Sequence, residues 1–241
     1  MIDVGLLLTM IVAVGVPSLV ARWWPLTTFG EPVGFLDVAI WPAMVGLGVG
    51  RLVAVALDGP SSLGSLSDLL IIRSGVEFWP GVAAAMLAAA WSAHRSGVAS
   101  FDRLADLVPL ALIGYAGYEA TCLVRDGCYG PETSLGIRPP GTSTTMLPVG
   151  ILAAIAVVVG AVVLHRQLGR RASWAVVMGG LTVVAGVRSL AAIWLPHIGD
   201  GLTRQHWSSI AVLLATVPAL TAGFLAGTQQ HVSGSCSTDE R

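Results

Sequence analysis

The chain has 241 residues, of which 54% are hydrophobic and 11% charged, with a formal net charge of −1. Together with a mean hydropathy of +0.78, this composition excludes a water-soluble globular domain and predicts an all-α polytopic membrane protein. The nearly neutral charge argues against a nucleic-acid partner. The 3 cysteines are too few for a dense disulfide framework or a cysteine-rich zinc site. We predict no metal and no cofactor.

Seven apolar windows of the sequence are long enough to cross a bilayer as helices, at about 1.5 Å per residue. Backbone groups in lipid must find their hydrogen-bond partners within the segment, so each window is predicted to be helical. No basic residue precedes the first window, which favours a retained span over a cleaved signal peptide. The windows cover residues 2–21, 33–57, 74–93, 104–124, 147–165, 173–195 and 207–227.

The distribution of arginines between the windows predicts the orientation. The densest cluster, Arg166, Arg170 and Arg171, lies between the fifth and sixth windows, and the positive-inside rule places it in the cytoplasm. The N-terminus is then outside and the C-terminus cytoplasmic. We expect residues 1–227 to form a single transmembrane helical domain and the polar residues 228–241 to form a disordered cytoplasmic tail.

Glycine spacing in the second window predicts close helix packing. Gly46 and Gly50 are separated by one helical turn, and this spacing lets a neighbouring backbone approach closely. Two acidic residues near predicted inner helix starts, Asp37 and Asp106, are interpreted as charges favoured by the helix dipole.

Ionisable residues inside four windows form a predicted polar layer. Arg51, Glu77, Glu119 and Arg188 all fall within about two turns of the predicted outer boundary. Intramembrane charges usually face the bundle interior or a wet cavity, so a shared chamber is expected. Two interpretations stay open, which are ion pairs that fix helix register and an outer-leaflet pocket whose arginines bind an anionic lipid headgroup.

The segment LADLVPLALIGYAGYEATCLVRDGCYGPETSLGI, Leu104 to Ile137, resembles the signature region of the prolipoprotein diacylglyceryl transferases. The stretches GVGRL, SGVEFWPG and GLTRQHW are similar to other parts of that family, so the resemblance covers most of the chain. It implies a seven-helix protein of the bacterial plasma membrane. The implied reaction is transfer of diacylglyceryl from phosphatidylglycerol to the cysteine thiol of a lipoprotein signal peptide, at the outer face of the membrane.

Several positions depart from the pattern of that family. Tyr118-Glu119 stands where the signature begins Gly-Arg, and Trp79 replaces a histidine. The late segment keeps an arginine at Arg188, but apolar residues around Ala192 and Leu195 stand where the family has a glutamate and a second arginine. These departures favour an alternative, a catalytically degenerate homologue that binds lipid or peptide. A transporter or channel is a third class, disfavoured because the inner halves of the third, fifth and seventh windows carry no charge.

The candidate site residues follow from the polar layer and the resemblance. Catalytic roles are assigned to Glu119, Arg188 and Glu77, with either glutamate as the base. Headgroup binding is assigned to Arg51, Arg125, Arg138, Tyr129 and His206, although a lone interfacial histidine is also typical of a membrane anchor. The expected partners are phosphatidylglycerol or another anionic lipid and a lipoprotein signal peptide, and the sequence does not identify the oligomeric state.

The two cysteines of the signature region, Cys122 and Cys128, leave three interpretations open. Six positions apart on one helix they would point to different faces, but the intervening Arg-Asp-Gly can turn the chain and allow an outer-face disulfide. They can also be two packed thiols of the family pattern, or one can be a nucleophile. The following segment, residues 130–148, is expected to be a loop broken by proline and glycine, either a plain connector or a cap over the pocket.

Overall fold

The computed structural model describes residues 4–29, 34–58, 76–125, 127–139, 141–195 and 203–235, with side chains up to residue 221. Every candidate site residue falls inside these ranges. Several sequence features lie partly outside them, among them Ser74 and Gly75 of the third window, Asp126 of the signature region, the glycine and leucine that begin GLTRQHW, and Cys236 with the rest of residues 236–241.

One long α-helix is found in each of the seven apolar windows. The bounds are α1 Val4–Val20, α2 Phe35–Asp58, α4 Phe78–Arg95, α5 Ser100–Ala120, α6 Val149–Gln167, α7 Ser173–Trp194 and α8 Arg204–Ser235. Short 3₁₀ turns at Thr27–Phe29 and Thr121–Arg125 precede α2 and extend α5. The predicted helical content and the order of the helices therefore hold for the described residues.

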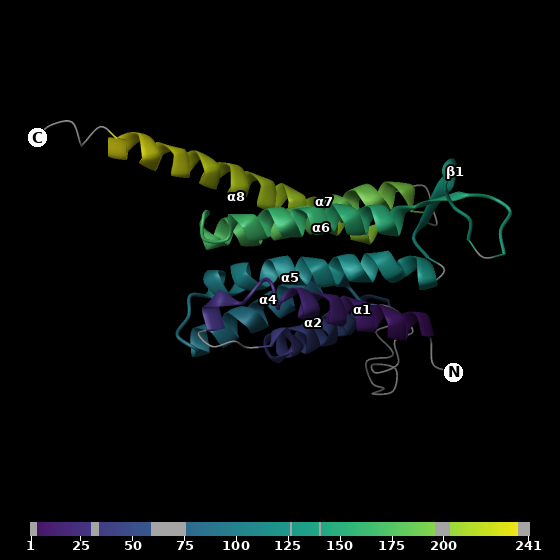
Figure 1. Ribbon diagram of the computed structural model, residues 1–241, viewed down its shortest axis with the longest axis horizontal. Helices are drawn as coiled ribbons and strands as arrows, with labels where there is room; N and C mark the ends of the chain where they lie inside the picture. Colours follow the sequence, from purple (N-terminus) through teal and green to yellow (C-terminus); the bar gives the residue numbers. More distant parts are fainter. Residues whose placement is uncertain are drawn as a thin grey trace, which may run out of the picture.

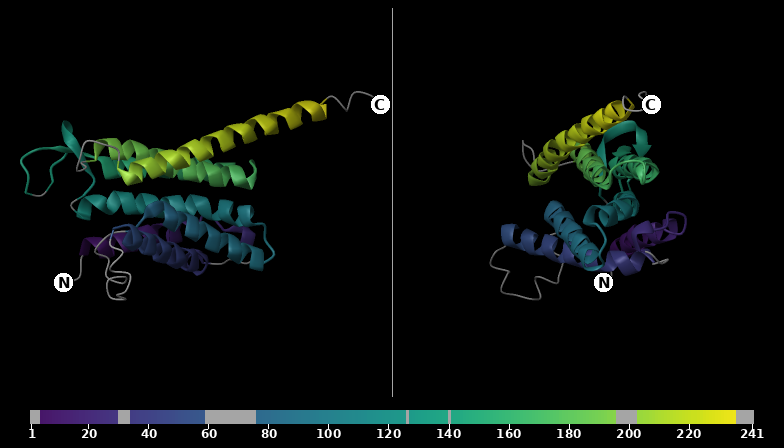
Figure 2. Two further views of the ribbon diagram at one scale, coloured as in Figure 1. Left: turned by 180° about the vertical axis from the view of Figure 1, so that it is seen from behind. Right: turned by 90° about the vertical axis from the view of Figure 1, so that its left-hand side faces the viewer.

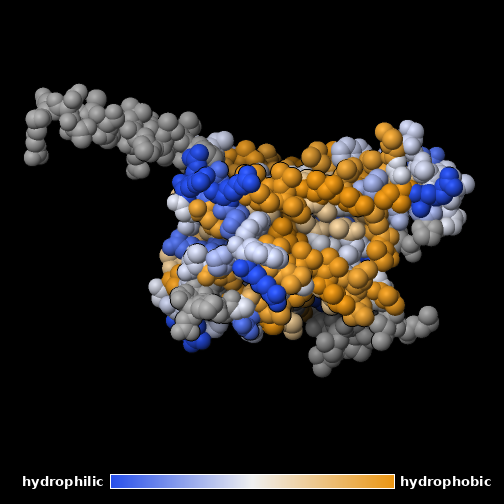
Figure 3. Space-filling view, in the orientation of Figure 1, coloured by the Kyte–Doolittle hydropathy of each residue, from blue (hydrophilic) through white to orange (hydrophobic). Residues whose placement is uncertain are grey.

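Four of these helices are long and apolar enough to cross a membrane: the segments Phe35–Leu57, Ser100–Arg125, Val149–Gln167 and Ser173–Trp194. The apolar helix α1 is shorter. Figure 3 shows hydrophobic residues across the middle of the bundle and hydrophilic residues gathered toward its two ends, as in a membrane-embedded protein. The seven-span topology and the orientation of the termini stay predictions.

Helix α5 lies at the centre of the bundle. Figures 1 and 2 show α1, α2 and α4 on one side of it and α6, α7 and α8 on the other. One buried cluster joins Leu112, Ile113 and Ala116 of α5 to Val157 of α6 and its alanine neighbours. A second cluster joins α5 to α4 and α7 through Leu104, Ala105, Ala89, Val176 and Val177. These contacts bury α5 on several faces.

Glycines bring α2 and α4 into backbone contact, as their spacing predicts. A Cβ atom added at Gly46 would lie 2.8 Å from the carbonyl oxygen of Gly81, and one at Gly50 would lie 2.7 Å from that of Glu77. The backbone N–H of Glu77 also donates to the carbonyl of Gly50 over 3.0 Å. This contact fixes Glu77, the residue directly before α4, against α2.

A two-stranded antiparallel ribbon adds to the all-α fold that the composition predicts. Strand β1, Tyr129–Ile137, pairs with β2, Met146–Pro148, with Tyr129 opposite Pro148 and Glu132 opposite Met146. The backbone N–H of Thr133 donates to the carbonyl of Thr145 over 3.0 Å. Alternation of β-forming residues between the prolines explains the strand. We call the end of the bundle that carries this ribbon the ribbon end (Figure 1).

Helix α8 continues past the predicted span boundary at residue 227. It reaches Ser235, so the helix enters the segment predicted to be a disordered tail, because no proline or charged run interrupts the sequence after Pro218. Figure 1 shows this helix leaning away from α6 and α7 toward the C-terminus. Residues 236–241 lie outside the described residues, so the disorder of that part of the tail stays a prediction.

Candidate functional site

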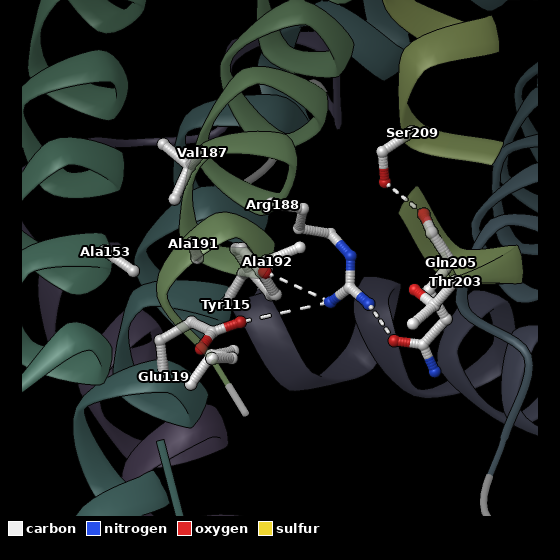
Figure 4. A pocket seen from close by; sticks show the side chains of 11 residues that line it. Tyr115, Glu119, Ala153, Val187, Arg188, Ala191, Ala192, Thr203, Gln205 and Ser209 are labelled. Atoms are coloured by element: carbon white, nitrogen blue, oxygen red, sulfur yellow. Dashed lines mark hydrogen bonds and ion pairs between the residues drawn. The ribbon is translucent and has the colours of Figure 1, made fainter. Parts of the chain in front are cut away.

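A pocket of about 220 Å³ opens at the ribbon end between α5, α7 and the first turns of α8 (Figure 4). Its polar lining comes from Tyr115 and Glu119 on α5, Arg188 on α7, and Thr203, Gln205 and Ser209 at the start of α8. Apolar residues, Ala153, Val187, Ala191, Ala192 and Leu195, form the remaining wall. The pocket therefore combines two charged groups with neutral hydrogen-bonding groups at the end of an apolar bundle.

Arg188 is held in the pocket by three neighbours. Its Nη1 donates to the hydroxyl of Tyr115 over 3.2 Å and its Nη2 donates to Oε1 of Gln205 over 3.3 Å. Its guanidinium carbon lies 4.2 Å from the centre of the Phe78 ring, a cation–π contact. The buried Nε has no hydrogen-bond partner among the described residues. Arg188 is thus fixed in direction and keeps one donor for a further acceptor.

Glu119 faces Arg188 across the pocket. It follows Tyr115 by four residues on α5, so the two side chains share one helix face. Its Oε1 lies 4.0 Å from Nη1 of Arg188, and the Glu119 and Arg188 side chains are 13% and 18% exposed. A hydrogen-bonded pair of this type has a separation of about 2.8 Å. The two charges attract each other but do not use up each other's hydrogen-bonding capacity.

Two contacts join the start of α4 to the start of α8 beside the pocket. Arg204 Nη2 donates to Oε1 of Glu77 over 2.5 Å, with Arg204 51% exposed and Glu77 13% exposed. The indole Nε1 of Trp79 donates to the hydroxyl of Ser209 over 3.0 Å, and Ser209 donates in turn to the carbonyl of Gln205 over 2.9 Å. These contacts connect the two halves of the bundle on either side of α5.

An apolar groove begins where the polar pocket ends. It has a volume of about 220 Å³ and is bounded by Phe78, Trp79 and Tyr115 near the pocket and by Leu104 and Val177 at greater depth. From Tyr115 to Leu104 the groove follows roughly 16 Å of α5. A second apolar groove of about 330 Å³ shares Leu104 and Val108 with the first. The polar pocket therefore adjoins space suited to hydrocarbon chains.

The structure brings together two of the eight predicted site residues, Glu119 and Arg188. Glu77 lies nearby in its ion pair with Arg204, and Arg51 and His206 are buried on α2 and α8 outside the lining of the pocket. The remaining three lie around the ribbon: Arg125 stacks on Tyr118, with its guanidinium carbon 4.4 Å from the ring centre, Tyr129 donates to the carbonyl of Leu123, and Arg138 is exposed.

Cys122 and Cys128 form a disulfide, with Cα atoms 5.8 Å apart. Cys128 has a φ of 60°, and this left-handed conformation turns the chain back as the Arg-Asp-Gly sequence allows. A Cβ atom added at Gly150, the second residue of α6, would lie 2.7 Å from the Glu119 carbonyl and 3.2 Å from Cβ of Cys128. The bridge and α6 therefore pack directly against the end of α5 that carries Glu119.

Sequence reasoning missed several residues that shape the pocket. Tyr115 and Gln205 both accept hydrogen bonds from Arg188, and Phe78 lies against its guanidinium. The four-residue spacing of Tyr115 and Glu119 was a usable signal, since it places both on one face of α5. Gln205 carried no comparable signal, because its position depends on how α8 packs against α7. Among the described residues, no three histidine, cysteine, aspartate or glutamate side chains gather in one group.

No protein-family model matches the chain, and no curated protein matches it. The similarity to diacylglyceryl transferases therefore rests on the sequence motifs, and its consequences are proposals.

Proposed function

We propose that the protein is a phospholipid-binding protein of the bacterial plasma membrane, built on the scaffold of the prolipoprotein diacylglyceryl transferases and catalytically degenerate. The observation that carries this proposal is Arg188, a guanidinium with an unpartnered Nε among the described residues, in a polar pocket that adjoins an apolar groove. In this proposal the ribbon end faces the outside of the cell and the pocket opens at the outer leaflet.

Guanidinium chemistry supports a phosphate ligand. The planar donor set of arginine binds phosphate oxygens in a forked, charge-assisted geometry. Tyr115 and Gln205 hold two of the guanidinium nitrogens in place, so Arg188 needs little reordering when a phosphate enters. The groove starts at Phe78 and Tyr115, which both contact Arg188, so an acyl chain attached to that phosphate has apolar space beside it.

The ion pair of Glu77 with Arg204 favours binding over catalysis. Glu77 is engaged by Arg204 at 2.5 Å, and Glu119 lies 4.0 Å from Arg188. The hydrogen bond from Arg204 occupies Oε1 of Glu77 and holds that carboxylate at the junction of α4 and α8. Trp79, which stands where the family has a histidine, donates to Ser209 and helps to close the space between α4 and α8.

Diacylglyceryl transfer is the second candidate, favoured by a carboxylate and a cation in the same pocket. In that reaction Glu119 takes the thiol proton of the signal-peptide cysteine. The thiolate sulfur then attacks the glycerol carbon of phosphatidylglycerol, a carbon–sulfur bond forms, and the carbon–oxygen bond to the phosphate breaks. Glycerol phosphate leaves with the bonding electrons, and Arg188 stabilises its charge. Glu77 is the other candidate base.

Lipid retention by purified protein tests the first proposal. Wild type, Arg188→Ala and Arg138→Ala are purified in mild detergent and the bound lipid is measured by native mass spectrometry. Arg138 is the matched control: the sequence assigned this arginine to headgroup binding, but it is exposed at the same end and lies outside the pocket lining. We expect wild type and Arg138→Ala to retain phospholipid. Arg188→Ala should retain at least about tenfold less phospholipid than wild type. Equal retention by all three proteins would overturn the proposal.

A lipobox peptide separates the two candidates. The protein is reconstituted in vesicles that contain phosphatidylglycerol and phosphatidylethanolamine, and the peptide is examined by mass spectrometry. We expect retained lipid and an unmodified peptide, while an active transferase modifies the same peptide in parallel. A diacylglyceryl thioether that forms with wild type and disappears in Glu119→Gln would establish the transferase instead.

A further inference from the structure

We propose that the pocket selects a zwitterionic headgroup of the phosphoethanolamine type over an anionic headgroup such as phosphoglycerol. Arg188 binds the phosphate and Glu119 binds the primary ammonium. This inference rests on the proposed lipid-binding function and narrows the class of lipid. It also departs from the phosphatidylglycerol donor that the resemblance implies.

The net charge of the pocket favours a zwitterionic headgroup. Among the described residues that line it, only Glu119 and Arg188 are charged, so their formal charges sum to zero. The neighbouring pair, Glu77 and Arg204, also sums to zero. A pocket for a headgroup with a net negative charge would be expected to carry excess positive charge. This pocket instead matches a ligand with one charge of each sign.

The distance between the two charges leaves both able to bind a ligand. Glu119 Oε1 and Arg188 Nη1 are 4.0 Å apart, too far for a direct hydrogen bond. The Nε of Arg188 has no partner among the described residues. Both groups can therefore bind a ligand without first breaking a tight ion pair. In phosphoethanolamine, two carbon atoms separate the phosphate ester oxygen from the ammonium, so one headgroup can reach both.

Glu119 penalises an anionic headgroup. A phosphate in contact with Arg188 places negative charge close to the Glu119 carboxylate, and the low exposure of both side chains limits screening by water. The glycerol of phosphatidylglycerol can donate hydrogen bonds to Glu119 but cannot cancel this repulsion. An ammonium cancels it and donates charge-assisted hydrogen bonds to the carboxylate.

The neutral groups of the pocket favour a primary ammonium over a quaternary one. The side-chain oxygens of Thr203 and Gln205 line the pocket on the side of Arg188 away from Glu119. Each accepts one hydrogen bond, from the backbone of His206 and from Arg188, so each keeps a lone pair for a further donor. A primary ammonium has three N–H donors, whereas choline has none. We therefore expect phosphatidylethanolamine to bind more tightly than phosphatidylcholine, with phosphatidylglycerol the weakest of the three.

Competition in lipid nanodiscs tests the selection. Wild-type protein is placed in nanodiscs that contain equal amounts of phosphatidylethanolamine, phosphatidylcholine and phosphatidylglycerol. The protein is then released from the discs, and the lipids that it retains are identified by native mass spectrometry. We expect phosphatidylethanolamine to exceed phosphatidylglycerol by about tenfold among the retained lipids. Glu119→Gln should bring this ratio to about one, whereas Glu119→Asp should keep the preference. Glu132→Gln is the matched control, because Glu132 is an exposed glutamate of β1 outside the pocket.

The outcomes separate this inference from the function on which it rests. A wild-type preference for phosphatidylglycerol, or a ratio unchanged in Glu119→Gln, overturns the selection while Arg188-dependent lipid retention still stands. If wild type and Arg188→Ala retain no lipid, both proposals fall. Soluble glycerophosphoethanolamine is added in a further arm. If it displaces bound lipid at a concentration equal to that of the lipid, the charge selection stands but the ligand is the free phosphoester.

Discussion

Two polar clusters lie at opposite ends of the bundle, and they satisfy their charges in different ways. At the end away from the ribbon, Asp106 accepts 2.9 Å hydrogen bonds from both the backbone N–H and the hydroxyl of Thr28, and a longer one from the hydroxyl of Thr27. Arg103 donates to the Thr28 carbonyl over 3.1 Å. Both charged residues are buried. We call Arg103, Asp106, Thr27 and Thr28 the anchored cluster.

The pocket at the ribbon end also holds an arginine and a carboxylate, but these two charges line a cavity. Asp106 has its hydrogen bonds supplied by the chain between α1 and α2, whereas Glu119 faces open space and a guanidinium 4.0 Å away. The anchored residues do not line any of the pockets described above. A buried charge that the backbone satisfies holds helices together, and one that faces a cavity with spare donors is able to bind a ligand.

Replacement of Asp106 by alanine gives the largest expected effect. It leaves the half-buried N–H and hydroxyl of Thr28 without their acceptor and the buried Arg103 without its neighbouring carboxylate, and we expect the free energy of unfolding to fall by about 3 kcal/mol. Thermal unfolding in detergent measures the change. Asp102→Ala, which removes an exposed acid one turn earlier on α5 and its hydrogen bond from Ser173, should cost less. If Asp106→Ala abolished lipid retention in protein that remains as stable as wild type, the structural role of the anchored cluster would be wrong.

Removal of the disulfide should have the next largest effect. The bridge closes a short loop, with a sequence separation of 6, and loops of this size contribute about 2 kcal/mol in the chain-entropy model. We expect Cys122→Ser with Cys128→Ser to lower the unfolding temperature and, through Gly150, to loosen the end of α5 that carries Glu119. Reductant should lower the unfolding temperature of wild type and leave the double variant unchanged. Equal stability of both proteins would contradict a bridge that supports the pocket.

The helices were predictable from the sequence because hydropathy and the length of a bilayer-crossing helix determine them almost without tertiary information. The close approach of α2 and α4 was predictable from Gly46 and Gly50 for a similar reason, since the absence of a side chain is visible in the sequence. Asp106 shows the limit of this reasoning. Its position near a predicted helix start indicated a dipole effect, but its partners, Thr27 and Thr28, come from a turn before α2.

The pocket was only half predictable. Equal predicted depth correctly grouped Glu119 with Arg188, but depth alone does not say which charges share a side of the bundle. Glu77 therefore found an unforeseen partner in Arg204, and Arg51 lies outside the pocket lining. The ribbon was missed because pairing of β1 with β2 depends on contacts across a long loop and not on local periodicity.

Arg188→Lys sharpens the comparison at the pocket itself. Lysine keeps the positive charge but loses the planar fork that contacts Tyr115 and Gln205 together. We expect phospholipid retention to fall several-fold, by about 1 kcal/mol, with little change in unfolding temperature. Native mass spectrometry and thermal unfolding of the same preparation give the two values. A large loss of stability with full lipid retention would assign Arg188 to the same structural class as Asp106.

The ion pair between Glu77 and Arg204 should give the smallest effect. Arg204 is half exposed, so solvent screens the pair, and such pairs contribute at most about 1 kcal/mol. A double-mutant cycle with Glu77→Gln and Arg204→Gln, followed by thermal unfolding, measures the coupling. We expect it to be small and to decrease further in high salt. A coupling of several kcal/mol that persists in salt would mean that α4 and α8 are locked together as firmly as the anchored cluster. The space between them could not then open for a lipid, and a ligand would have to enter the pocket from the water side.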